Sequence, residues 1–143
     1  MNSTTKTSVL KDRKVILSVL WIFAIFNYLY ADVMTLIDPV VQEEIATGNV
    51  GPIQMNQGFL LGAAILMETA IVMVLLSRIL KYSANRWANI IAGIIHSVAV
   101  FSSMFIGEPP TLYYLFFGTI EIACTLFIIG YAWTWPRPEG HSV

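Results

Sequence analysis

Three ionisable residues, Glu68, His96 and Glu121, each lie near the middle of a long apolar segment of this sequence. Carboxylates and imidazoles exchange protons and bind cations, and within membrane segments such residues usually belong to functional sites. A charged side chain at the bilayer centre costs about 2.5–3.5 kcal/mol on insertion scales, so we expect these residues to meet one another rather than lipid. A proton shared between the carboxylates, or a pair of glutamate and protonated histidine, would lower that cost.

The composition indicates that the elements holding these residues lie in a membrane. The chain has 143 residues, of which 57% are hydrophobic and 12% charged, and its mean hydropathy is +0.70. A soluble domain carries about a quarter charged residues. The net charge of −1 gives no basis for a nucleic-acid partner, and the single cysteine, Cys124, excludes a disulfide within the chain.

Four segments reach the roughly 20 residues needed to cross the bilayer core. They cover about residues 15–36, 57–80, 87–106 and 111–133. The connections between them are short, so we treat residues 1–143 as a single domain. The sequence therefore predicts an all-α fold, a four-helix transmembrane bundle.

Lys and Arg residues predict the orientation of this bundle. All eight lie in the N-terminal tail, the second connection or the C-terminal tail: Lys6, Lys11, Arg13, Lys14, Arg78, Lys81, Arg86 and Arg137. The first and third connections carry only acidic residues: Asp38, Glu43, Glu44 and Glu108. By the positive-inside rule, we expect a multi-pass protein of the inner or plasma membrane with both termini in the cytoplasm.

The first connection contains the signals of a short helix. Asp38 can cap its start, Pro39 suits its first position, and Gly48 can end it. We predict a short amphipathic helix on the outer side, lying on the membrane surface or over the mouth of the bundle. A plain connector and a gating lid are both open interpretations of it.

The three ionisable residues are predicted to share one depth. Glu68, His96 and Glu121 lie about 11, nine and ten residues from the starts of their segments, and Asn27 of the first segment has a similar level. At about 1.5 Å per residue, all of them fall near the bilayer midplane. The sequence therefore predicts one binding site for a proton, a cation or another ligand.

Each segment also has a stripe of polar and small residues that could face the bundle interior. The stripes are Tyr28, Asp32 and Thr35; Gln57, Leu61, Ala64 and Glu68; Asn89, His96 and Ser103; and Tyr114, Gly118, Glu121 and Thr125. We expect Tyr28 and Asp32 to form an outer vestibule above the shared layer.

Three functions fit this pattern. The first is proton- or cation-coupled transport or conduction through Glu68, His96 and Glu121. The second is a membrane-embedded binding protein or enzyme for a small or lipidic ligand, and the third is an accessory subunit. No catalytic residue is assigned, and no cofactor is expected. A metal is not expected either, because the Glu-x-x-His pair of di-iron bundles is missing from the sequence.

A homo-oligomer is a further hypothesis, because so small a chain buries little surface by itself. The motif from Gly58 to Gly62 offers a small-residue contact face, either within the bundle or against a second copy.

The segments NYLYADVMTLIDP, GPIQMNQGFLLGAAILMETAIVMVLLSR and YSANRWANIIAGIIH resemble a family of small four-helix prokaryotic membrane proteins of unknown function. The resemblance covers Lys14 to about Pro136 and implies the fold without an activity. A looser resemblance links Glu68 and the following Arg78 to DoxX-like membrane proteins. A topological analogy to four-helix sterol-isomerase-like proteins implies a ligand held among intramembrane acids.

Overall fold

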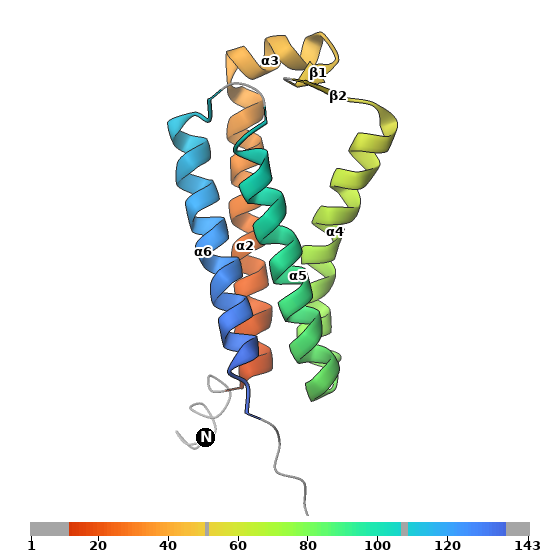
Figure 1. Ribbon diagram of the computed structural model, residues 1–143, viewed down its shortest axis with the longest axis vertical. Coiled ribbons are helices and arrows are strands. Elements are labelled where there is room, and N and C mark those ends of the chain that lie inside the picture. The colour runs from red at the N-terminus through yellow and green to blue at the C-terminus, as the bar shows by residue number, and fades with distance from the viewer. Residues whose placement is uncertain (1–11, 51, 107–108, 137–143) are drawn as a thin grey trace, which may run out of the picture.

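The computed structural model describes residues 12–50, 52–106 and 109–136. Five helices and two very short strands follow one another in this part of the chain (Figure 1). The elements are α2 (Arg13–Ile37), α3 (Pro39–Ala46), β1 (Asn49–Val50), β2 (Ile53–Gln54), α4 (Gln57–Ile79), α5 (Tyr82–Ser103) and α6 (Leu112–Trp133).

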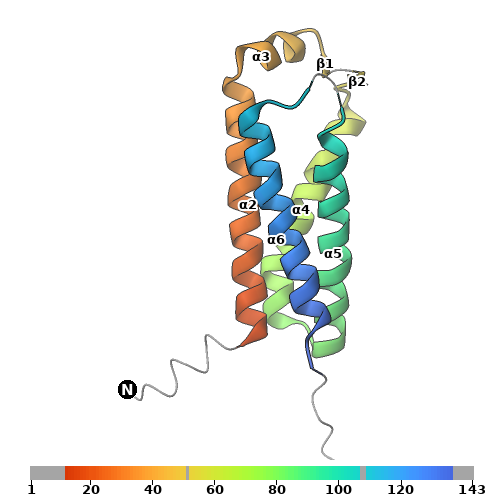
Figure 2. The same ribbon diagram turned by 60° about the vertical axis from the view of Figure 1, so that its left-hand side comes forward.

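The four long helices lie side by side and alternate in direction (Figures 1 and 2). Helix α2 packs against α4 and α6, while α5 packs extensively against α6 and less extensively against α4. The start of α2 and the end of α6 lie at one end, called here the terminal end, and α3 crosses the opposite end, called here the α3 end. Each connection therefore reverses the direction of the chain.

Three helices are long and apolar enough to cross a membrane: α2, α4 and α6. Helix α5 has a similar length, but it carries Asn85, Asn89 and His96 on its buried face. These side chains lower its hydropathy without facing the surroundings of the protein.

The described side chains are distributed with large apolar residues outside and many polar residues inside. Large apolar residues cover the outside, and Phe26, Leu75 and Phe127 are each more than half exposed. The interior contains many polar residues, namely Ser18, Ser77, Asn85, Asn89, His96, Glu121 and Thr125. An outer surface this apolar would be unfavourable in water, where exposed patches of such size usually mark contact sites.

The bounds of α5 differ from the predicted span of residues 87–106. The helix begins at Tyr82 and ends at Ser103. The early start includes Asn85, which is a weak helix former. Here the Asn85 side chain donates to the backbone oxygen of Ser77 at 2.6 Å, so a contact with α4 compensates for its low propensity.

The helix predicted in the first connection is confirmed as α3. Asp38 caps it by accepting a hydrogen bond from the backbone nitrogen of Val40 at 3.0 Å, and Gly48 follows it with a φ of 78°. The antiparallel pairing of β1 and β2 was not predicted, because strands of two residues leave no alternating pattern in the sequence. Glu108 of the third connection lies outside the described residues.

Candidate functional site

Two of the contacts between helices α2 and α5 show how these helices are aligned. The indole nitrogen of Trp21 donates to Oδ1 of Asn89 at 2.8 Å. The rings of Tyr28 and His96 stack with centroids 5.4 Å apart. The second contact lies seven residues, or about two helical turns, beyond the first on both helices. The two helices therefore run parallel with matching faces.

The same seven-residue spacing aligns α5 with the antiparallel helix α6. The hydroxyl of Tyr114 donates to Oγ of Ser103 at 2.6 Å. His96 lies seven residues before Ser103 on α5, and Glu121 lies seven residues after Tyr114 on α6. Because both steps cover about two turns, these residues share the interface that the Tyr114–Ser103 bond marks.

The same seven-residue spacing applies to the inner face of α4. The hydroxyl of Ser77 donates to Oδ1 of Asn89 at 3.2 Å. Steps of seven residues along α4 lead from Ser77 to Ala70 and then to Ala63. Ala70 is fully buried, as expected for a residue on the inner face of α4.

Three layers result, and each is named here after its α5 residue. The Asn89 layer contains Trp21, Ser77, Asn89 and Ile128. The His96 layer contains Tyr28, Ala70, His96 and Glu121. The Ser103 layer contains Thr35, Ala63, Ser103 and Tyr114.

The Asn89 layer is closed and its polar groups are paired. Its four side chains are fully buried. In addition to the bonds from Trp21 and Ser77, Nδ2 of Asn89 donates to Oδ1 of Asn85 at 2.7 Å and to its backbone oxygen at 2.9 Å. This network links α2, α4 and α5 and shuts the interior toward the terminal end.

The His96 layer is just as buried, but its polar atoms are not paired. The exposed fractions of Tyr28, His96 and Glu121 are 4%, 1% and 5%. Among the described residues, no hydrogen-bond partner exists for the Tyr28 hydroxyl, Nε2 of His96 or Oε1 of Glu121. A buried polar atom without a partner costs about 1–3 kcal/mol, and such atoms often belong to functional sites.

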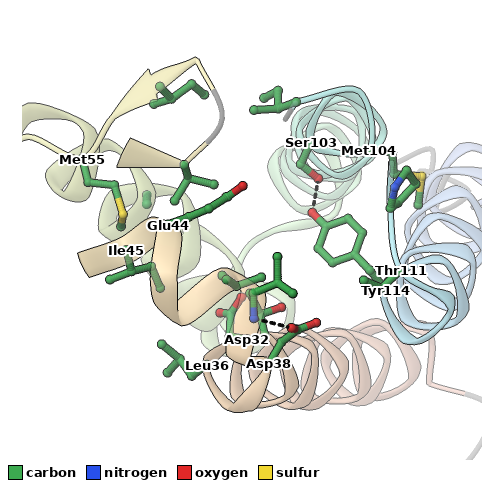
Figure 3. Close-up of a pocket in the computed structure, with 18 of the residues that line it drawn as sticks. Asp32, Leu36, Asp38, Glu44, Ile45, Met55, Ser103, Met104, Thr111 and Tyr114 are labelled. Atoms are coloured by element: carbon green, nitrogen blue, oxygen red, sulfur yellow. Dashed lines mark hydrogen bonds between the residues drawn. The ribbon is translucent and has the colours of Figure 1, made fainter. Parts of the chain in front are cut away.

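The Ser103 layer borders a cavity of about 1300 Å³ at the α3 end (Figure 3). All four residues of the layer line it. Helix α3 and the β1–β2 hairpin form its roof, to which Val41, Ile45 and Met55 contribute. The volume exceeds the 300–1,000 Å³ of usual ligand sites, so a sizeable organic molecule fits.

The cavity exists because α4 diverges from α5 toward the α3 end (Figure 1). At the terminal end, side chains bind α4 to its neighbours: Ser18 donates to the backbone oxygen of Val74 at 2.9 Å, and Lys14 donates to that of Leu80 at 2.7 Å. In the part of α4 nearer α3, no described side chain makes such a bond to another helix. One end of the helix is thus fixed, and the other can stand apart.

The cavity is mostly apolar but contains acids. Asp32, Asp38 and Glu44 line it, and Glu44 projects from α3 toward its centre (Figure 3). Asp38 is already engaged, since it caps α3 and accepts a hydrogen bond from the hydroxyl of Tyr113 at 3.2 Å. None of the described lining residues is Lys, Arg or His. The cavity therefore has a negative electrostatic character.

Glu68 does not join His96 and Glu121, and the predicted three-residue cluster is wrong in this respect. Its side chain is exposed. Glu68 lies two residues from Ala70, so about 200° of helical rotation places it on the opposite face of α4. Its predicted stripe faces outward with it, since Gln57, Leu61 and Ala64 are exposed as well.

The other predicted site residues occupy different places. Tyr28 belongs to the His96 layer, and Asp32 lines the cavity one turn beyond it. Asn27 is half-buried, and its amide donates to the backbone oxygen of Phe23 in its own helix at 2.8 Å, so it does not reach the layer.

Residues that the sequence interpretation missed complete the site. They are Trp21, the small residues Ala63, Ala70 and Ser77 on α4, and the lining acids Asp38 and Glu44. The seven-residue spacing on α4, which matches Asn89, His96 and Ser103, was the available signal. Within the described ranges, no group of three His, Cys, Asp or Glu residues could hold a metal ion.

The family model of DUF6326, a family of unknown function, matches residues 8–142. The chain belongs to DUF6326. Searches of curated proteins and of solved structures each found no match for this DUF6326 chain. The family assignment agrees with the resemblance to a family of unknown function. The prokaryotic four-helix membrane character of that family and the DoxX likeness stay predictions.

Proposed function

We propose that this protein binds small lipophilic cations inside a membrane, in the cavity at the α3 end. The observation that carries this proposal is an apolar cavity of about 1300 Å³ that contains Asp32 and Glu44 and no basic residue among its described lining. A ligand with apolar groups and one positive charge would match both the walls and the carboxylates.

The proposal includes a topology. We infer that α2, α4, α5 and α6 form a four-helix transmembrane bundle, although α5 is less apolar than the other three. The described basic residues support cytoplasmic termini, because Arg13, Lys14, Arg78, Lys81 and Arg86 all lie at or near helix ends of the terminal end. The α3 cavity would then lie in the outer half of the membrane.

Binding is tested with tetraphenylphosphonium and tetraphenylborate, two ions of similar shape and opposite charge. The full chain is placed in lipid nanodiscs, and empty nanodiscs correct for partition into the bilayer. We expect saturable binding of the cation and none of the anion.

Variants then locate the site. Glu44→Gln and Asp32→Asn should each weaken tetraphenylphosphonium binding about tenfold, the size expected for a lost attraction of about 1–2 kcal/mol. Glu43→Gln is the matched control, because Glu43 is an exposed residue of α3 that does not line the cavity. Equal binding of both ions, or no effect of either lining variant, would reject the proposal. A chain that binds neither ion would fit the accessory-subunit hypothesis.

Proton- or cation-coupled transport is the second candidate, and the buried Glu121 favours it. Transport requires a state in which the Asn89 layer opens toward the terminal end, since Trp21 and Asn89 now close that route. Proteoliposomes with an imposed pH difference should accumulate tetraphenylphosphonium against its gradient if the protein transports it. Binding without such flux would leave the protein as a binding protein.

A homodimer is proposed from the position of Glu68. This carboxylate lies near the middle of α4 on the exposed face. A two-fold axis along the bundle would bring the same residue of a second copy to the same depth, where two carboxyl groups can share a proton. The partner copy would thus remove an unfavourable contact with lipid.

A further inference from the structure

The His96 layer forms a second polar site beneath the cavity. Three helices supply one side chain each: Tyr28 from α2, His96 from α5 and Glu121 from α6. Each is at least nine-tenths buried, and each has a polar atom without a partner among the described residues. The stacking of Tyr28 on His96, and the edge contact of Trp21 with the His96 ring at 5.4 Å, keep the layer in place.

This site can communicate with the α3 cavity but not with the terminal end. On the terminal side, the paired Asn89 layer closes the interior. On the cavity side, the side chains of Met104 and Val100 cover Gly118, which lies one turn from Glu121 on α6. Met104 itself lines the cavity. Methionine is flexible, so rotation of this one side chain would admit water from the cavity to Glu121.

The charges around Glu121 show what can neutralise its carboxylate. Helix α2 presents Tyr28 and, within electrostatic reach, Asp32. Helix α5 presents His96, and α4 presents Ala70, which does not titrate. Helix α6 itself adds Tyr114 and Cys124. No described Lys or Arg lies in the His96 layer. A proton, or a cation that arrives from the cavity, must therefore balance Glu121.

We propose that Glu121 is a proton-binding residue whose proton leaves when a cation occupies the cavity. When the cation binds beside Asp32, the O–H bond of the Glu121 carboxyl group breaks. The proton passes to cavity water and from there to the bulk solution. One positive charge enters and one leaves, so the net charge of the buried region stays the same. The hydroxyl of Tyr28 and the ring of His96 act as positioning groups that can donate hydrogen bonds to the new carboxylate.

The proposal rests on cation binding in the cavity, and calorimetry separates the two claims. Tetraphenylphosphonium is titrated into the full chain in nanodiscs, in phosphate and in Tris buffer at the same pH. Because the two buffers take up protons with different heats, the difference in measured heat counts the protons released. By linkage, binding should also tighten by up to about tenfold per pH unit where Glu121 holds its proton.

We expect close to one released proton per bound cation in the unmodified chain. Glu121→Gln should bind the cation with no proton release and no dependence on pH, because its amide resembles a protonated acid and cannot ionise. Glu43→Gln, on the exposed side of α3, is the control and should release protons as the unmodified chain does.

Each result decides one of the claims. No binding in any buffer would reject the proposed function. Binding with equal heats in both buffers would reject the proton linkage alone, and proton release that persists in Glu121→Gln would assign it to another group. If Glu121→Gln does not fold, infrared difference spectra of the unmodified chain still test the proposal. Addition of tetraphenylphosphonium should remove a protonated-carboxyl band, and an unchanged band would overturn it.

Discussion

Replacement of Asn89 by alanine should destabilise the packing of the helices at the terminal end of the bundle. The side chain of Asn89 takes part in four hydrogen bonds: it accepts from Trp21 and Ser77 and donates to Oδ1 and the backbone oxygen of Asn85. Two of these bonds, those from Trp21 and Ser77, join α5 to other helices. Hydrogen bonds between helices in a membrane contribute about 0.6 kcal/mol each on average, so the loss of these two costs about 1.2 kcal/mol. The stranded indole N–H of Trp21 adds about 1–3 kcal/mol. We therefore expect Asn89→Ala to lower the free energy of unfolding by about 2–4 kcal/mol.

The assay is unfolding of the purified chain in mixed micelles with increasing sodium dodecyl sulfate, followed by circular dichroism. Asn27→Ala is the matched control, because the Asn27 amide bonds only to the Phe23 backbone oxygen of its own helix. It should change the free energy of unfolding by less than about 1 kcal/mol.

A double-mutant cycle tests the physical reason. In a Trp21→Phe background the indole donor is gone, so Asn89→Ala should cost about 1–3 kcal/mol less than it does in the unmodified chain. If Asn89→Ala destabilises no more than Asn27→Ala, or if the cycle shows no coupling, the Asn89 layer does not hold the terminal end together.

Three other predictions test topology, packing and association. Tags at both termini should report the cytoplasm, and a tag in the α3–hairpin segment should report the outside; one terminus found outside would overturn the orientation. Gly93→Ala should destabilise the fold by about 1–3 kcal/mol because its Cβ would meet the Ile129 side chain and the backbone oxygen of Thr125, whereas Gly130→Ala, with open space around it, should stabilise α6 by about 0.5–1 kcal/mol; equal thermal shifts would refute this. Ala64→Cys on the exposed face of α4 should form a disulfide between copies in native membranes, and Ile94→Cys on the exposed face of α5 should not; the reverse pattern would place any dimer elsewhere.

Much of the architecture could be predicted from local sequence. Long apolar runs predicted α2, α4 and α6 to within a few residues, because a run of about 20 apolar residues has the length of a membrane-spanning helix. Asp38, Pro39 and Gly48 predicted α3, since caps and φ preferences act within a few residues of chain. The spacing of Asn89, His96 and Ser103 predicted the inner face of α5, because polar residues stand out on an apolar helix.

The inner face of α4 was decided only by tertiary structure. Its sequence is apolar on every side, and lipid is as apolar as the interior, so hydropathy does not distinguish the two faces. The one carboxylate on the helix suggested that Glu68 faces inward. In the structure, the fully buried residue at this level of α4 is instead Ala70, so its side of the helix faces the interior. Glu68 then necessarily faces outward, because the two residues lie about 200° apart on the helix.

The cavity also depends on tertiary structure. It requires that α4 be bonded to its neighbours at the terminal end, through Ser18 and Asn85, and stand apart from them near α3. No local pattern encodes the angle between two helices, since that angle follows from contacts between residues far apart in the chain. The sequence alone could therefore place Asp32 and Glu121 on their helices. Only the packed helices show that Asp32 lines the cavity and that Glu121 is buried in the layer beneath it.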